Sequence, residues 1–243
     1  RAQQMLNSRS ALLLHESCRR HRAPLARRTA TMVKPPTEVV AAKRSLRKAM
    51  KALLSALDAT TLAAESACVA RQVVARDDWA SASTVAAFCS MPSGELATRP
   101  LLEAAFAAKK RVFLPRVDDV KSRKMTMLEA YSLDDVDGFA RSTWGIPEPP
   151  AGEGRADALD AGVDFVLVPG VAFDGGRGRL GHGAGFYDTW FAALAAGGAA
   201  PPRVGVALAD QLLPNSKIPD CPAAVPREAH DEVLDAVVVA KRA

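Results

Sequence analysis

One glycine-rich stretch, residues 163–190, constrains the fold more than any other part of the chain. It opens with a short apolar run, Phe165 to Val168, which predicts a buried strand. It closes with 186–196, a segment rich in alanine and aromatic residues that predicts a helix. Between them, six of the eleven residues from Gly175 to Gly185 are glycine, so backbone N–H groups can approach a ligand closely. This order of strand, glycine loop and helix N-terminus indicates an anion-binding loop and favours phosphate as the anion.

Two other interpretations of the glycine loop stay open. A flexible surface loop is also rich in glycine, although such a loop needs no apolar segment on either side. A dinucleotide-binding loop is the second, because Gly176-Arg-Gly-Arg-Leu-Gly181 matches G-x-G-x-x-G. The match begins well after the strand ends, and no acidic residue follows at about 20 residues to bind a ribose. A nicotinamide-dependent dehydrogenase is therefore the weakest alternative.

Short apolar runs alternate with helical patterns along the rest of the chain. Further strands are expected at 84–89, 112–114, 125–130, 204–208 and 236–240, and further helices at 38–57, 61–76 and 98–109. Pro115 and Arg116 are expected to close the second of these strands, and residues 132–162 to be mostly loop. The alternation predicts one α/β domain over residues 37–243, with a mostly parallel central sheet flanked by helices. Ligands of such domains bind at the carboxyl ends of the strands.

Residues 1–36 have a composition of their own. They hold eight basic residues against one acid, which leaves 24 basic and 26 acidic residues in the rest of the chain. This acid-poor, arginine-rich leader predicts a mitochondrial or plastid transit peptide. The alternative is a disordered tail, or a start at Met32 with a cytoplasmic protein. Because the excess positive charge belongs to the leader, no nucleic-acid partner is expected for the rest of the chain. The chain has no run of about 18 apolar residues, so no membrane-spanning segment is expected either.

Lys43 and Arg47 lie four residues apart on one face of the first predicted helix. Two such cations can bind a polyphosphate or simply form a solvated basic face. Glu95, which follows a predicted strand, is either a binding-site carboxylate or a first-turn acid favoured by the helix dipole.

Two motifs carry a resemblance to a known family. Pro169-Gly-Val-Ala-Phe-Asp174, followed by Arg179-Leu-Gly-His-Gly-Ala-Gly-Phe-Tyr-Asp188, resembles the signature of the 5-formyltetrahydrofolate cyclo-ligases. The segments at 43–47, 143–149 and 225–235 are similar to further motifs of that family, so the resemblance covers about residues 40–240. It implies a sugar-isomerase or coenzyme-A-transferase-like α/β fold and a monomer. It also implies conversion of 5-formyltetrahydrofolate to 5,10-methenyltetrahydrofolate with ATP and Mg²⁺, releasing ADP and phosphate.

The resemblance implies a role for individual residues as well. The residues implied to bind ATP are Lys43, Arg44, Ser45, Leu46, Arg47, Arg179, Leu180, Gly181 and Tyr187. The implied catalytic loop consists of His182, Gly183, Ala184, Gly185 and Phe186. The residues implied to bind the reduced folate are Cys89, Met91, Glu95, Trp144 and Tyr187. Asp188 and Asp231 are implied to hold Mg²⁺, and Arg116 is a further candidate for an anionic group.

Three positions in the loop differ from the usual pattern of the family. His182 stands where relatives often have Arg or Tyr, Ala184 replaces Gly or Lys, and Phe186 replaces Tyr. These differences leave open a relative that binds folate without turnover. Release of phosphate during turnover separates the enzyme from this alternative, and nicotinamide binding would identify a dehydrogenase.

Overall fold

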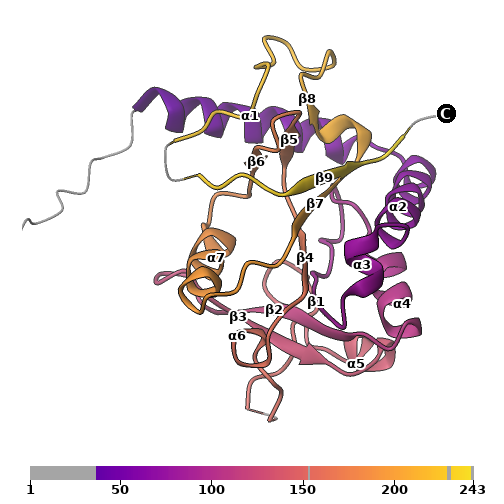
Figure 1. Cartoon of the computed structure of the whole chain (residues 1–243). Helices are drawn as coiled ribbons and strands as arrows, with labels where there is room; N and C mark the ends of the chain where they lie inside the picture. Colours follow the sequence, from indigo (N-terminus) through magenta and orange to yellow (C-terminus); the bar gives the residue numbers. More distant parts are fainter. Residues whose placement is uncertain (1–36, 153, 229–230, 242–243) are drawn as a thin grey trace, which may run out of the picture. The chain divides into compact units, whose positions relative to one another are not determined.

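The computed structural model describes residues 37–152, 154–228 and 231–241 (Figure 1). The predicted leader, residues 1–36, lies outside the described residues, as does His230 of the C-terminal motif. The described residues all belong to one compact unit, Pro35–Ala243. Among the described residues, no single helix is long and apolar enough to cross a bilayer. Only one bent pair, Glu38–Ser55 with Ala59–Val74 at an angle of 108°, meets the length and composition together.

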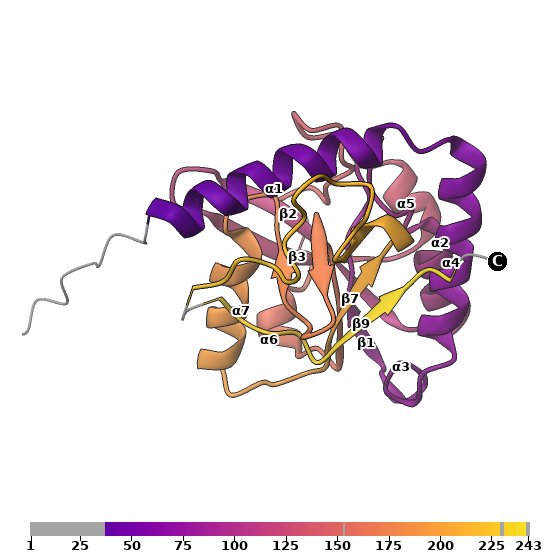
Figure 2. The same ribbon diagram turned by 90° about the horizontal axis from the view of Figure 1, so that it is seen from above.

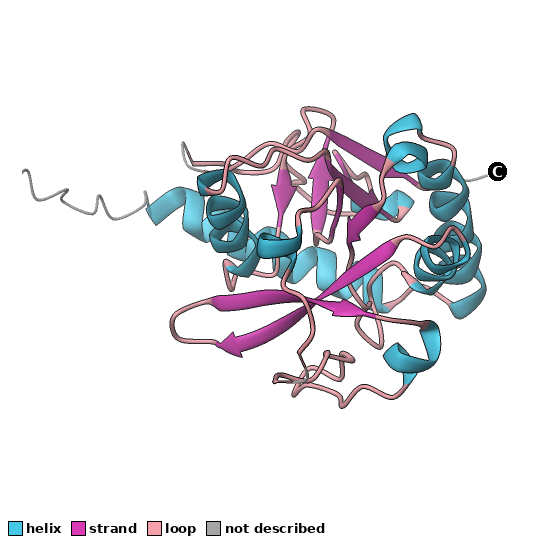
Figure 3. Ribbon diagram, turned by 60° about the horizontal axis from the view of Figure 1, so that its bottom comes forward, coloured by secondary structure: helices cyan, strands magenta, loops and turns pink. Residues whose placement is uncertain are grey.

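A six-stranded sheet forms the centre of the domain, in the order β3-β2-β1-β4-β7-β9. All neighbours in it are parallel except β2 and β3, which form an antiparallel hairpin at one edge (Figure 3). The mostly parallel sheet expected from the sequence is therefore confirmed. Its strands are β1 (Thr84–Ala86), β2 (Arg111–Asp119), β3 (Lys124–Ala130), β4 (Phe165–Val168), β7 (Arg203–Ala207) and β9 (Ala236–Val239).

Helices cover both faces of the sheet, which explains why β4 is apolar at every position (Figures 1 and 2). Phe165 and Leu167 point into one core, and Val166 and Val168 into the other. The first core is shared with helices α1 (Thr37–Ser55), α2 (Ala59–Val74), α3 (Asp77–Ser81), α4 (Arg99–Ala107) and α5 (Leu133–Asp137). The second core is shared with α6 (Ala158–Ala161) and α7 (Phe186–Ala196).

Part of the glycine-rich stretch forms a hairpin, which the sequence did not indicate. Strands β5 (Ala172–Asp174) and β6 (Arg179–Leu180) pair antiparallel, and β8 (Leu212–Leu213) joins β5 in a second, three-stranded sheet. The buried carboxylate of Asp174 closes the turn by accepting the N–H of Gly178 at 2.8 Å and that of Val225 at 2.9 Å. α1 runs alongside this small sheet (Figures 1 and 2).

Two strand boundaries expected from the sequence are wrong. β2 does not close at Pro115 but continues to Asp119, because beyond Phe113 it pairs with β3 alone and a proline there needs no partner on its open side. β1 ends at Ala86 rather than Cys89. Phe88 and Cys89 are still buried, so the apolar run marks the core and not the length of the strand. The region 132–162 is mostly loop, as expected, apart from α5 and α6.

Candidate functional site

The sheet brings two loops together where its strand order changes direction. From β1 the chain continues to β2 on one side, and from β4 to β7 on the other, so the carboxyl ends of β1 and β4 flank a topological switch point. The loop after β1 carries Met91 and Glu95, and the chain after β4 carries the glycine hairpin. His182 Nε2 lies 3.6 Å from Glu95 Oε1, so these loops meet. The candidate site lies at this point.

The glycine loop, residues 181–185, joins β6 to α7 and is held by a contact from α1. Arg47 Nε donates a hydrogen bond to the Gly181 carbonyl oxygen at 2.7 Å. Gly183 has φ +100, and a Cβ there would lie 3.3 Å from Arg47 Cζ. Gly185 precedes α7 with φ +77, and no side chain caps the helix among the described residues. The first N–H groups of α7 are therefore available to an anion.

Charged side chains surround this loop in pairs. Arg179 Nη2 lies 2.8 Å from Asp188 Oδ1, while its Nη1 donates to the Pro169 carbonyl oxygen at 3.2 Å. Asp188 is 59% exposed, which leaves its second oxygen open to solvent. Lys43 Nζ lies 2.5 Å from Asp231 Oδ2 and 3.2 Å from Glu228 Oε2. Lys43 therefore ties α1 to the C-terminal segment.

Arg47 interacts electrostatically with the two acids that the sequence assigned to a metal. Burial lowers the pKa of the Arg47 guanidinium, whereas the charges of Asp231 and Asp188 raise it. Both carboxylates are therefore near enough to the Arg47 guanidinium group to influence its charge. No group of three or more histidine, cysteine or acidic side chains is placed to hold a metal ion in the described part of the chain.

The opposite side of the site is formed by the loop after β1. Glu95 is 6% exposed, and its Oε2 accepts the Met91 N–H at 2.8 Å, so it is not a solvated first-turn acid. The Tyr187 hydroxyl is buried without a hydrogen-bond partner, and burial together with the charge of Glu95 raises its pKa. Cys89 is 7% exposed, and burial raises the pKa of its thiol to about 12. A buried carboxylate thus lies close to a buried phenol.

Trp144 lies next to Phe186, the first residue of α7. Its side chain is 45% exposed, so it does not plug the core. Its ring meets Phe186 edge-on with the centroids 6.3 Å apart. The next residue, Gly145, lies against the Pro92 ring, because a Cβ there would be 3.0 Å from Pro92 Cγ. An aromatic face is therefore open beside the start of α7.

Several residues named from the sequence have no side chain in the site. Arg44 and Ser45 lie on the exposed face of α1, whereas Leu46 and Leu180 are buried in the first core. Arg116 donates from Nη1 to the Pro149 carbonyl oxygen at 3.1 Å, and its Nε lies 3.4 Å from Asp118 Oδ1. These two contacts hold Arg116 in the loop region around Pro149.

The structure adds three residues that the sequence reasoning did not assign. Glu228 shares Lys43 with Asp231, and Asp174 fixes the glycine hairpin. Both residues lie within the motifs that resemble those of the family, and their acidic side chains were the feature of the sequence that could have marked them as candidates. Arg123 comes from the turn between β2 and β3, and its side chain packs on Gly185. No local pattern in the sequence marks it.

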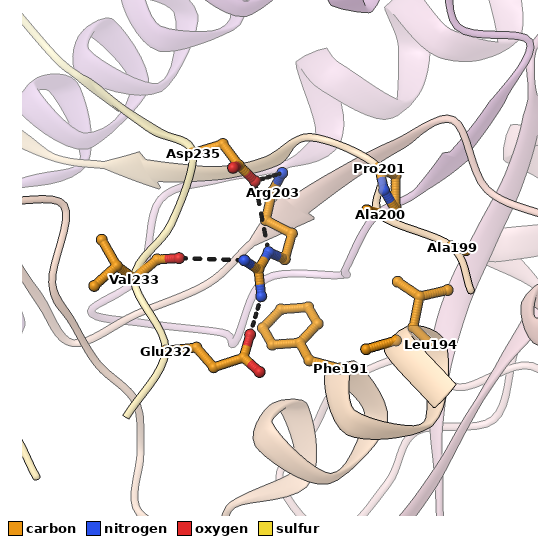
Figure 4. Close-up of a pocket in the computed structure, with 10 residues that line it drawn as sticks. Phe191, Leu194, Ala199, Ala200, Pro201, Arg203, Glu232, Val233 and Asp235 are labelled. Carbon is orange, nitrogen blue, oxygen red and sulfur yellow. Dashed lines mark hydrogen bonds and ion pairs between the residues drawn. The ribbon is translucent and has the colours of Figure 1, made fainter. Parts of the chain in front are cut away.

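A cavity of about 320 Å³ on α7 is separate from this site (Figure 4). Its wall includes Phe191, Leu194 and Pro201, and Arg203 lies at its rim. The Arg203 guanidinium is neutralised there by Glu232 and by Asp235, whose Oδ2 lies 3.5 Å from Arg203 Nε. None of the residues assigned to the site from the sequence lines this cavity.

Comparison with known proteins gives a consistent set of relatives. The model of the 5-formyltetrahydrofolate cyclo-ligase family matches residues 39–240. A probable 5-formyltetrahydrofolate cyclo-ligase of Schizosaccharomyces pombe is 30% identical over 206 residues, which cover 82% of this chain and 96% of that protein. A mitochondrial 5-formyltetrahydrofolate cyclo-ligase of Arabidopsis thaliana is 27% identical, with 81% and 73% covered. The NMR structure of Aquifex aeolicus 5,10-methenyltetrahydrofolate synthetase superimposes with a TM-score of 0.63 at 28% identity, covering 82% of this chain and 90% of that one.

Proposed function

This chain belongs to the 5-formyltetrahydrofolate cyclo-ligase family, and we propose that it converts 5-formyltetrahydrofolate to 5,10-methenyltetrahydrofolate with ATP and Mg²⁺, releasing ADP and phosphate. One observation carries the proposal. The uncapped start of α7 has Arg47 and Arg179 beside it, and His182 of the loop before it lies 3.6 Å from the buried carboxylate of Glu95. One side of the site suits a polyphosphate, and the other suits a substrate that offers hydrogen-bond donors.

The proposed reaction needs little covalent chemistry from the protein. The formyl oxygen of the substrate attacks the terminal phosphorus of ATP, and ADP leaves. The folate N10 then attacks the activated formyl carbon, the carbon–oxygen bond breaks, and phosphate departs with the former formyl oxygen. N10 gives up its proton as the ring closes. Positioning and neutralisation of charge account for most catalysis in such phosphoryl transfers.

The glycine loop is the proposed place of transfer. Arg47 uses Nε to hold the Gly181 carbonyl oxygen, which leaves its terminal nitrogens for phosphate oxygens. Gly183 and Gly185 have left-handed conformations, and we propose that these turn the loop N–H groups toward the anion that also binds at the start of α7. In this proposal the run from His182 to Phe186 contacts the transferring group mainly through its backbone. The substitutions at Ala184 and Phe186 are therefore compatible with turnover.

Mg²⁺ fits this site as an ion that arrives with the nucleotide. Two carboxylates, Asp188 and Asp231, both act electrostatically on Arg47, and Mg²⁺ in nucleotide sites commonly takes one or two carboxylates together with phosphate oxygens and water. We propose that these two acids hold it, after exchanging their present partners Arg179 and Lys43. When bound, the ion neutralises charge on the phosphate oxygens.

The folate is proposed to bind on the side of the loop after β1. The buried Glu95 carboxylate can accept hydrogen bonds from N–H groups of the pterin, and Met91 fixes its orientation through the backbone. The exposed ring of Trp144 offers a flat face for the pterin, next to Phe186. In this proposal the buried Tyr187 hydroxyl, which lies within electrostatic reach of Glu95 and Cys89, helps to shield this side of the site from water.

Spectroscopic detection of the methenyl product tests the proposed function. The protein is mixed with 5-formyltetrahydrofolate and Mg²⁺, with and without ATP, and released phosphate is measured in parallel. We expect product and phosphate to form in equal amounts and only with ATP. Binding of folate without any product would instead support the relative that binds folate without turnover.

We also propose that residues 1–36 direct the protein to an organelle. Their composition supports this, and one relative, from Arabidopsis thaliana, is a mitochondrial protein. A fusion of residues 1–36 to a fluorescent protein should enter mitochondria or plastids. A cytoplasmic fusion would favour the tail interpretation.

A further inference from the structure

Arg123 is a cation that reaches the glycine loop from a distant part of the chain. It lies in the turn of the β2–β3 hairpin at the edge of the sheet, and β3 is a neighbour of α7 (Figure 3). A Cβ added to Gly185 would lie 3.3 Å from Arg123 Cδ and 3.4 Å from its Nη1. The guanidinium group therefore lies on the residue that directly precedes α7.

The turn is built to hold Arg123 in this position. The Asp119 carboxylate accepts the N–H of Lys121 at 3.0 Å and both the N–H and the hydroxyl of Ser122, at 3.2 and 2.6 Å. Arg123 then adopts a left-handed backbone with φ +58, which is uncommon for any residue other than glycine. The chain thus accepts an unfavourable conformation at the residue whose side chain reaches the loop.

The other cations of the site are already engaged by protein groups. Lys43 pairs with Asp231, Arg179 pairs with Asp188, and Arg47 donates to the Gly181 carbonyl oxygen. No carboxylate pairs with Arg123 anywhere in the described ranges. The loop itself, from Gly181 to Phe186, contains no lysine or arginine. Arg47 keeps its terminal nitrogens, whereas Arg123 is the arginine at this loop that has no side-chain donor bonded to any described protein group.

We propose that Arg123 binds the phosphate oxygens of ATP at the start of α7 and acts as a catalytic residue in the phosphoryl transfer. This inference rests on the proposed function, because it takes ATP as the ligand. A guanidinium group presents a planar fork of donors that matches phosphate oxygens, and it retains its charge under all ordinary conditions. Placed beside the transferring phosphate, it would stabilise the charge that spreads over the phosphate oxygens in the transition state.

The test compares Arg123→Met with Lys121→Met in the full chain. Lys121 is an exposed cation of the same turn, so its removal changes net charge equally without touching Gly185. We expect Arg123→Met to lower kcat/KM for ATP by about 10- to 100-fold, the worth of a hydrogen bond to a charged group, and to leave KM for folate unchanged. Lys121→Met should behave as the wild type. Arg123→Lys should recover part of the loss, because it restores the charge but not the fork.

Equal kinetics for Arg123→Met and Lys121→Met would overturn the inference, as would a loss confined to KM for folate. If the wild-type protein forms no methenyl product, the proposed function fails and calorimetry with MgATP decides the inference separately. Weaker binding of MgATP by Arg123→Met than by Lys121→Met would support it. Equal affinities, or no binding of MgATP by the wild type, would refute it.

Discussion

Gly185 is a residue where the need for glycine has two separate causes. Its backbone has φ +77, and Arg123 occupies the space that a side chain would need. We expect Gly185→Ala to lower the free energy of unfolding by about 1 kcal/mol because of the left-handed backbone, and to reduce ATP-dependent turnover strongly. Urea unfolding and steady-state kinetics measure the two effects.

Gly198→Ala is the matched control for this substitution. Gly198 has φ +79, but a Cβ there would meet nothing within 4 Å. The Gly198→Ala variant should lose about as much unfolding free energy as Gly185→Ala but should keep the turnover of the wild type. A similar loss of turnover in both variants would show that the effect comes from backbone strain alone and not from the contact with Arg123.

Cys89 is expected to make the free energy of unfolding depend on pH in the alkaline range. Burial raises its pKa from 9.0 to about 12, so the thiol stays protonated in the folded state while it ionises in the unfolded state. The unfolded state therefore binds fewer protons between pH 9 and pH 12, and stability falls as the pH rises through this window. Between pH 7 and pH 10 this group should remove about 1 kcal/mol from the free energy of unfolding.

Cys89→Ala isolates this contribution, because it removes the titrating thiol. The measurement is the change in unfolding free energy from pH 7 to pH 10 in each protein, so that any cavity cost of the substitution cancels. The wild type should lose more stability over this interval than the variant. Identical losses would mean that Cys89 does not titrate differently in the two states.

At the scale of elements, α1 is fixed to the C-terminal segment by one lysine. The side chains of Lys43, Glu228 and Asp231 are 12%, 11% and 21% exposed, so the loss of Lys43 would leave two acids poorly solvated. We expect Lys43→Met to lower the free energy of unfolding without ligand by about 2 kcal/mol, less than for a fully buried pair. Arg44→Met on the exposed face of the same helix should change it by less than about 0.5 kcal/mol.

Elements with a strong local pattern could be predicted from the sequence, and those fixed by distant contacts could not. The boundaries 165–168 and 186–196 were recoverable because β4 is apolar on both faces and α7 begins directly after a glycine. The β5–β6 hairpin was not, since it depends on Asp174 accepting N–H groups from both Gly178 and Val225. In the site, the motifs indicated Arg47, Arg179 and Asp188, whereas the approach of Arg123 depends on the pairing of β2 with β3 and has no local signature.

At the scale of the whole molecule, we expect residues 37–243 to carry the complete activity. This part forms its own compact unit, and the family match lies within it, at 39–240. We expect a chain beginning at residue 37 to be a monomer with the turnover of the full chain. Analytical ultracentrifugation and the methenyl assay check both points. A large loss of turnover on truncation would show that the leader takes part in the folded enzyme.

The central claim is that ATP activates the formyl oxygen at the glycine loop, and an isotope experiment tests it most directly. 5-Formyltetrahydrofolate with a heavy-oxygen label in its formyl group is converted with unlabelled ATP in unlabelled water, and the released phosphate is examined by mass spectrometry. Because the carbon–oxygen bond breaks after phosphorylation, we predict one labelled oxygen in each phosphate. Unlabelled phosphate, or no ATP-dependent product at all, would contradict the account.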